Sequence, residues 1–267
     1  MHSLGGICAG IDIFNLAIYP VLTYNSSTWF ELNKNTIKKL ENLQSILQRC
    51  LLGASNSTSI IAMNWDLGML PIEERINENK LNFLHFLNEQ DESNLSKEIY
   101  TIQKSLNFPG FICEARALIS RYKLPDIIDG KFEITKTKWK SMVKRAIRVN
   151  YEIESKTKMR NFSKLKDGPM LNEKFCRKEY LMKMNLTDAR MNFRLRSKTT
   201  NVKLNQKSSK SHAAKLWKCG EWGYLDSQSH IMWCTYFAPL REGLDVKNDL
   251  DVVHYFQQVF KHRNENE

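Results

Sequence analysis

NTIKKLENLQSILQRCLLG, from Asn35 to Gly53, is the most clearly helical stretch of the sequence. Its apolar residues recur every three or four positions, which places them on one face of an α-helix. They are Ile37, Leu40, Leu43, Ile46, Leu47, Cys50 and Leu51. Asn35 suits the N-cap and Gly53 suits the stop. The stretch therefore predicts a helix packed on a core, with Cys50 as a small core residue rather than a reactive thiol.

The same periodicity continues along most of the 267 residues and predicts a mainly α-helical protein. Proline and glycine are scarce, at 6 and 11 residues, and a hydrophobic fraction of 42% suffices for a packed core. One short helix is predicted to end near Gly68 and another to begin at Pro71. Further helices are predicted at about 93–106, 110–122, 135–159 and 185–198. Between residues 159 and 180 the pattern weakens, which predicts a poorly ordered segment.

Positive charge is concentrated in the middle of the chain. The formal net charge is +11, but residues 131–218 hold 25 Lys and Arg against 7 Asp and Glu, a net of +18. The remainder, with 15 basic and 22 acidic residues, carries a net of −7. A basic middle between acidic ends is the footprint of a polyanion contact, so RNA and/or DNA are the expected partners. A solvated lysine-rich surface is the alternative interpretation.

The basic helix at 135–159 has a narrow apolar stripe formed by Trp139, Met142, Val143 and Ile147, with cations around the rest of its surface. A second helix, at 185–198, repeats guanidinium groups one turn apart, a spacing that suits a phosphate backbone. The candidate phosphate contacts in the two helices are Lys138, Lys144, Arg145, Arg148, Arg190, Arg194, Arg196 and Lys198. Trp139 and Trp222 are candidate base-stacking groups, although Trp139 is better explained as core.

The N-terminal stretch from Leu4 to Tyr24 is largely apolar but contains Asp12, Asn15 and Pro20. A buried helix is the preferred interpretation, and a membrane helix is the alternative. The six cysteines are scattered and no cleavable leader is recognisable, so we expect an intracellular protein of the nucleus or cytoplasm, not of the membrane.

Three zinc-type ligands lie close together near the C-terminus: Cys219, His230 and Cys234. A Cys-x-x-Cys pair is missing, because Trp222 stands where a second thiol would follow Cys219. Asp226 is a weak candidate for the fourth ligand. On ligand count, packed thiols are favoured over a zinc site, and zinc remains the one possible cofactor.

Catalytic motifs are missing from the sequence. It has no phosphate-binding glycine loop, no Gly-x-Ser-x-Gly, no His-Glu-x-x-His and no Asp-Asp pair for a two-metal polymerase site. The stretch 125–136, PDIIDGKFEITK, approaches a nuclease-like pattern. Glu133 and Lys136 are separated by two residues, so on a strand they would face opposite sides. The sequence therefore predicts a chain that is not itself an enzyme.

The order of these landmarks resembles the C-terminal part of non-LTR (LINE-type) retrotransposon reverse transcriptases, from about residue 10 to the end. IYPVLTYNSSTW (18–29) contains the Tyr-x-x-x-x-Trp element of that family, as Tyr24 to Trp29, and the helix ENLQSILQRCLLG (41–53) follows. WDLGMLPIEERINENKLNFLHFL (65–87) contains its Gly-x-x-Pro-Ile turn. The family's basic segment and terminal Cys/His knuckle are similar to four further stretches of this chain: NLTDARMNFRLRSK (185–198), LWKC (216–219), SQSHIMWCTYFAPLREG (227–243) and DVVHYFQQVF (251–260).

This resemblance implies a helical, thumb-like domain at 1–130, a basic helical segment at 131–200, a polar linker at 201–215 and a degenerate zinc-knuckle-like module at 216–267. Aligned on Trp217, the family's knuckle places three ligands on Cys219, His230 and Cys234, with Trp222 in place of the fourth. The catalytic palm that precedes this region in the family is not part of the chain.

Function follows as an expectation from the same resemblance. The chain is expected to be a non-catalytic fragment of an RNA-directed DNA polymerase that binds RNA or DNA and partners the polymerase palm. The alternative is a free-standing or co-opted helical nucleic-acid-binding protein without a polymerase partner.

Overall fold

The computed structural model describes residues 6–29, 32–106, 109–129, 134–200 and 227–266. This part of the chain consists of helices and connecting turns without a strand, which confirms the prediction of a mainly α-helical protein. Two compact units are formed from separated segments: unit 1 from 1–11, 48–68 and 159–267, and unit 2 from 12–47 and 69–158. The predicted linear boundaries at 130, 200 and 215 stay predictions, and the two units divide the chain differently.

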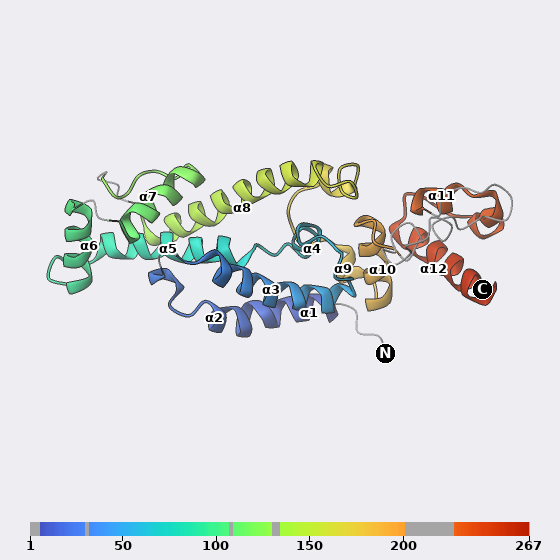
Figure 1. The fold of residues 1–267 in the computed structure, drawn as a ribbon, viewed down its shortest axis with the longest axis horizontal. Coiled ribbons are helices and arrows are strands. Elements are labelled where there is room, and N and C mark those ends of the chain that lie inside the picture. Colours follow the sequence, from blue (N-terminus) through green and yellow to red (C-terminus); the bar gives the residue numbers. More distant parts are fainter. Residues whose placement is uncertain (1–5, 30–31, 107–108, 130–133, 201–226, 267) are drawn as a thin grey trace. The chain divides into compact units, whose positions relative to one another are not determined.

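Unit 2 contains helices from both sides of the Gly68 to Pro71 turn. They are α2 (Tyr19–Leu22), α5 (Ile72–Glu89), α6 (Leu95–Leu106), α7 (Phe111–Tyr122) and most of α8 (Lys136–Arg160), with the greater part of α3 (Lys34–Leu52) (Figure 1). The bounds of α3, α5, α6, α7 and α8 agree with the predicted helices to within about two residues, whereas α2 covers only part of the stretch predicted as one helix.

A buried polar cluster joins α5 to α7 within unit 2. The hydroxyl of Tyr122 donates to Glu74 Oε2 at 2.5 Å, and Asn77 Nδ2 donates to that hydroxyl at 3.0 Å. Arg121 Nη2 donates to the other Glu74 oxygen at 2.8 Å. Burial raises the pKa of Glu74 above its usual range, while the Tyr122 hydrogen bond and the Arg121 charge oppose the shift. Glu74 therefore fixes the C-terminal turn of α7 against α5.

Helix α3 forms where it was predicted, but it presents a different face to the core. Gln44 and Gln48 are buried at 1% and 0% exposure, whereas Ile46 is 64% exposed and Cys50 is exposed. Each glutamine donates one internal hydrogen bond: Gln44 Nε2 donates to the Leu70 carbonyl at 3.1 Å, and Gln48 Nε2 donates to Asn64 Oδ1 at 2.6 Å. The prediction that Cys50 is a core residue is wrong.

The start of α3 also differs from the prediction by two residues. Asn33, not Asn35, takes the capping position, since its Oδ1 accepts a hydrogen bond from the Asn35 amide at 2.9 Å. Gly53 ends the helix as predicted, with a φ of 57° in the left-handed region that glycine tolerates.

Unit 1 contains the remaining helices. They are most of α1 (Gly6–Ile13), α4 (Ile60–Leu67), α9 (Tyr180–Lys183), α10 (Leu186–Arg196), α11 (Gln228–Trp233) and α12 (Asp249–Asn266), with 3₁₀ turns at Pro169–Asn172 and Thr235–Arg241. The segment between 159 and 180 packs through Leu165, Met170 and Phe175, which are at most 5% exposed. The expectation of a poorly ordered segment there is wrong, because these three apolar residues are spaced irregularly yet face inward.

A buried carboxylate organises the centre of unit 1. Asp66 is fully buried, and Arg196 of α10 donates to both of its oxygens, from Nε at 2.9 Å and from Nη2 at 3.2 Å. Tyr180 donates its hydroxyl to the same carboxylate at 2.8 Å. Arg196 also donates to Glu173 Oε2 at 2.7 Å. One side chain on α4 thus ties together α9, α10 and the segment before them.

Gly68 lets the chain pass close to this cluster. Its φ is +64°, and a Cβ at this position would overlap the backbone nitrogen of Arg177. The amide of Lys178, one residue further on, donates to the Asp66 carbonyl at 3.1 Å. The Trp-Asp-Leu-Gly stretch at 65–68 therefore packs directly against the backbone of residues 177 and 178 within unit 1.

A small hydrophobic cluster closes the C-terminal part of unit 1. It joins α10, α11 and α12 through Leu195, Ile231, Cys234, Phe237, Val253, Tyr255, Phe256 and Val259. The hydroxyl of Tyr255 donates to the Ile231 carbonyl at 2.7 Å and fixes α12 against α11.

The apolar N-terminal stretch is only half buried. Phe14 is 2% exposed, but Leu16 and Val21 are 81% and 75% exposed. The preferred interpretation of this stretch as a buried helix therefore holds for one side of it. Within the ranges that the structure describes, every helix is too short or too polar to cross a membrane.

Replacing Asp66 with Asn should destabilise the protein by about 3 kcal/mol, because the largely buried Arg196 guanidinium would lose the fully buried one of its two carboxylate partners while the side-chain shape is kept. Chemical denaturation followed by circular dichroism measures this change. The matched control is Glu179→Gln, which breaks an ion pair with Lys183 whose side chains are both more than 70% exposed. The control should leave the unfolding midpoint unchanged. Equal losses in the two variants would contradict the role given to Asp66.

Candidate nucleic-acid interface

Helix α8 is held in one orientation by a row of buried residues. Trp139, Val143 and Ile147 are each 0% exposed and follow one another at four-residue spacing. Trp139 Nε1 donates to the Leu81 carbonyl of α5 at 3.0 Å, and its ring stacks on His85 with centroids 5.8 Å apart. His85 Nε2 in turn lies 2.7 Å from the Ile134 carbonyl just before α8. These contacts fix which side of α8 faces outward, and they make Trp139 a core residue.

The outward side of α8 is strongly cationic. Lys138, Lys140, Lys144 and Arg145 are exposed, and none of them forms an ion pair or hydrogen bond with another residue in the described part of the chain. Arg148, which is half-buried, continues the row. We call these five residues the α8 cationic surface. Lys140, Lys144 and Arg148 follow one another at four-residue spacing, about 6 Å apart along the helix.

Helix α5 adds one cation and one carboxylate to this surface. Burial lowers the pKa of Arg75, whose guanidinium lies 4.5 Å over the Tyr19 ring and donates to Asn15 Oδ1 at 2.7 Å. Burial raises the pKa of the Glu78 carboxyl, and nearby Lys144, Arg75, Arg148 and Lys140 oppose the shift. One partly buried carboxylate is therefore surrounded by four cations, which leaves the local charge positive.

Three of the predicted phosphate contacts have structural roles instead. Arg196 is committed to Asp66 and Glu173. Arg190 donates to the Leu51 and Cys50 carbonyls at 3.0 and 2.8 Å, and Arg194 donates twice to the Gly53 carbonyl at 3.2 and 2.8 Å. These guanidinium groups satisfy the carbonyls at the end of α3, where the helix dipole is negative.

Lys198 lies just beyond α10 with a φ of 52°, in the left-handed region. Its amide donates to the Leu195 carbonyl at 3.2 Å, so its backbone belongs to the helix end. The phosphate-contact residues that remain on one continuous helical surface are thus those of α8.

The predicted zinc ligands are only partly placed. Cys219, Trp222 and Asp226 lie outside the described residues. His230 is half-buried in α11, where its amide donates to Ser227 Oγ at 3.0 Å, and Cys234 is 4% exposed within the C-terminal hydrophobic cluster. Within the described ranges there is no group of three or more His, Cys, Asp or Glu able to hold a metal. Zinc binding through Cys219, His230 and Cys234 stays a prediction.

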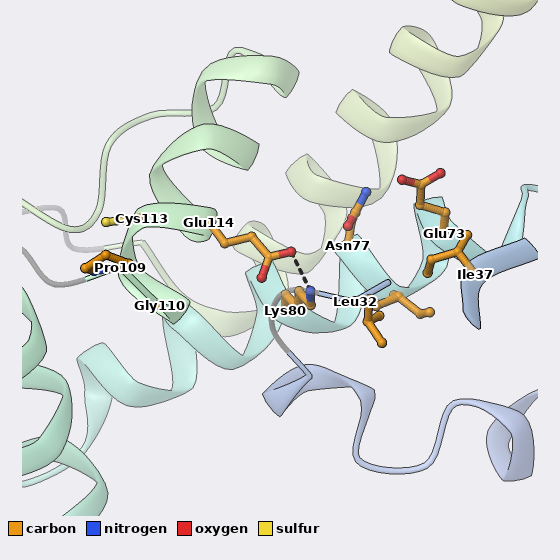
Figure 2. Close-up of a pocket in the computed structure, with 10 residues that line it drawn as sticks. Leu32, Ile37, Glu73, Asn77, Lys80, Pro109, Gly110, Cys113 and Glu114 are labelled. Carbon is orange, nitrogen blue, oxygen red and sulfur yellow. Dashed lines mark hydrogen bonds and ion pairs between the residues drawn. The ribbon is translucent and has the colours of Figure 1, made fainter. Parts of the chain in front are cut away.

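A cavity of about 370 Å³ between α5 and α7 was a second candidate site. Figure 2 shows Lys80 and Glu114 facing each other across it, with Glu73 and Asn77 also in its lining. Lys80 Nζ is almost fully buried and lies 2.5 Å from Glu114 Oε1. With Glu73 also in the lining, the charge of the cavity is net negative and poorly suited to a phosphate.

Comparisons with known proteins do not extend this account: no protein-family model matches the chain, and neither a curated protein nor a solved structure does. The resemblance to non-LTR retrotransposon reverse transcriptases accordingly rests on the order of the sequence landmarks.

The sequence alone did not predict that Arg75 and Glu78 belong to this surface. Arg75 and Glu78 are more than 60 positions from their α8 neighbours, and nothing in their local sequence marks them. The one sequence signal for them is a charged residue next to the apolar face of a long helix. Many surface helices have such residues, so this signal does not single out a binding site.

Replacing Glu78 with Gln should strengthen nucleic-acid binding a few-fold at neutral pH, because it removes the carboxylate beside four cations. Since the pKa of Glu78 is raised, the wild-type carboxyl takes up its proton earlier than usual as the pH falls. Wild-type affinity should therefore rise on acidification and approach that of the variant. Fluorescence anisotropy at several pH values measures both effects. A constant affinity ratio down to about pH 4.5 would contradict the placement of Glu78.

Proposed function

We propose that this chain is a non-catalytic nucleic-acid-binding region related to the C-terminal part of non-LTR retrotransposon reverse transcriptases. It binds the phosphate backbone of RNA or DNA through the α8 cationic surface. The observation that carries the proposal is that Lys138, Lys140, Lys144 and Arg145 face outward and form no ion pair or hydrogen bond in the described chain. The family resemblance gives this surface its expected ligand.

The charge arrangement favours a polyanion over an acidic protein. The cations are spread along about three turns of one side of α8, and charges distributed along a helix suit a repeating chain of phosphates. Most of the row is lysine, which acts as a compact point charge without planar recognition of a base edge. Binding should therefore be sensitive to salt and largely independent of sequence.

Exposed apolar residues near the N-terminus support the proposed partnership with a polymerase palm. Leu16, Val21 and Tyr24 are 81%, 75% and 81% exposed, and Ile46 of α3 is 64% exposed. Large apolar side chains left in solvent can mark a protein contact where they form one patch. In the proposed function, these residues pack against the palm that precedes this region in the family.

The triple variant Lys138→Gln/Lys140→Gln/Lys144→Gln tests the nucleic-acid proposal. If the three lysines each neutralise one phosphate, the slope of log K against log salt should become shallower by about 2 for single-stranded RNA and by about 2.7 for duplex DNA. Affinity near physiological salt should fall by at least about 10-fold. A titration series across several salt concentrations gives both values.

The matched control is Lys34→Gln/Lys38→Gln/Lys39→Gln on α3, which removes the same number of exposed lysines and the same charge from the same unit. It should change the slope by less than half as much. If the two triple variants lose affinity equally, net charge rather than the α8 surface drives binding, and the proposed site is wrong.

A further inference from the structure

Two helices of unit 2 each expose an apolar stripe with the same spacing. On α6 the stripe is Leu95, Ile99, Ile102 and Leu106, which are 68%, 48%, 48% and 67% exposed. On α8 it is Met142, Ala146, Val149 and Ile153, of which Val149 and Ile153 are 51% and 61% exposed. Both stripes advance by four, three and four residues, the spacing of helices that pack side by side.

The α8 stripe forms one wall of a groove. The groove has a volume of about 520 Å³, and its other wall is the C-terminal end of α7 and the turn after it, from Arg121 to Pro125. Its lining is mostly apolar, and its length along α8 covers about three helical turns. A groove of this kind accepts a helix that presents apolar side chains at the same spacing.

The charges beside the two stripes are complementary. Both lysines of α6 turn back onto their own unit: Lys97 Nζ donates to the Asn88 carbonyl at 3.0 Å, and Lys104 Nζ donates to the Ile128 carbonyl. Glu98, which flanks the α6 stripe, stays exposed and has no ion-pair partner within the described ranges. The surface that α6 offers is therefore apolar with a negative edge.

The rim of the α8 groove carries the opposite charge. Lys123 and Arg145 are exposed and have no ion-pair partner in the part of the chain that the structure describes. Arg121 is already neutralised by Glu74 at 2.8 Å and by Glu154 at 3.3 Å. Lys123 and Arg145 are therefore available to pair with a carboxylate at the edge of the apolar groove.

We propose that α6 of one copy of this chain docks in the α8 groove of a second copy, head to tail. The α6 stripe fills the groove, and Glu98 faces Arg145 and Lys123. An α6–α6 contact would leave the α8 stripe uncovered and Glu98 without a cation. Because the two surfaces are different, each copy keeps one of them open after docking, and further copies can add. The contact does not depend on nucleic-acid binding.

Two variants, each of which disrupts one of the two surfaces, test this arrangement. Ile99→Glu/Ile102→Glu disables the α6 stripe, and Val149→Glu/Ile153→Glu disables the groove; all four positions are about half exposed or more, so the fold should tolerate them. Analytical ultracentrifugation without nucleic acid measures association. Wild-type protein should show species beyond the dimer as its concentration rises through the micromolar range, and each variant alone should stay monomeric.

Mixing the two variants is the decisive step. Each retains the surface that the other lacks, so the mixture should form a one-to-one heterodimer and stop there. A mixture that stays monomeric overturns the proposal, as does a groove variant that still dimerises, which would indicate α6–α6 pairing. A wild-type protein that is monomeric at roughly 100 μM also overturns it.

A charge exchange makes the test independent of the apolar substitutions. Glu98→Lys and Arg145→Glu should each weaken wild-type association several-fold, and the two changes together in one chain should restore it. Additive weakening in the double variant would show that these two side chains do not meet, and would overturn the proposed register.

Discussion

The burial of Trp139 against α5 is the constraint on which the candidate interface depends. Its indole is fully buried, its Nε1 donates to the Leu81 carbonyl, and its ring lies on His85. A large side chain held by packing and by a hydrogen bond permits one rotation of α8 about its axis. Since the following buried residues lie four positions apart, that rotation turns Lys140 and Lys144 outward together.

The arginines of α10 and the outward lysines of α8 have different tasks. Arg190, Arg194 and Arg196 use their several donors to close the end of α3 and to neutralise the buried Asp66. Lys138, Lys140 and Lys144 of α8 form no ion pair or hydrogen bond in the described chain and remain in solvent. This division follows from chemistry: a planar guanidinium can satisfy two acceptors at once, whereas an ammonium group on a flexible stem is readily hydrated.

How much the sequence could predict depended on whether a helix has one dominant apolar face. For α8, Trp139, Val143 and Ile147 gave both the helix and its buried side. For α3, the apolar pattern was clear but misleading, because Gln44 and Gln48 find buried acceptors and face inward, while Ile46 and Cys50 face out. Hydrophobic periodicity contains no information about distant partners such as Leu70 and Asn64.

The same limitation affected the candidate site. The cations of α8 were predictable because no acidic residue lies among them, between residues 134 and 151. The roles of Arg190 and Arg196 were not, because their partners are about 140 and 130 positions away. Asp66 gave no local sign that it would be buried, so a basic helix near the C-terminus looked more available to phosphate than it is.

Lysine footprinting with an amine-reactive reagent tests the central claim most directly, because it reports on individual side chains in the unmodified protein. With saturating single-stranded RNA, Lys140 and Lys144 should lose most of their reactivity, while the equally exposed Lys38 and Lys39 of α3 should keep theirs. Bound RNA that leaves Lys140 and Lys144 as reactive as in the free protein would contradict the account.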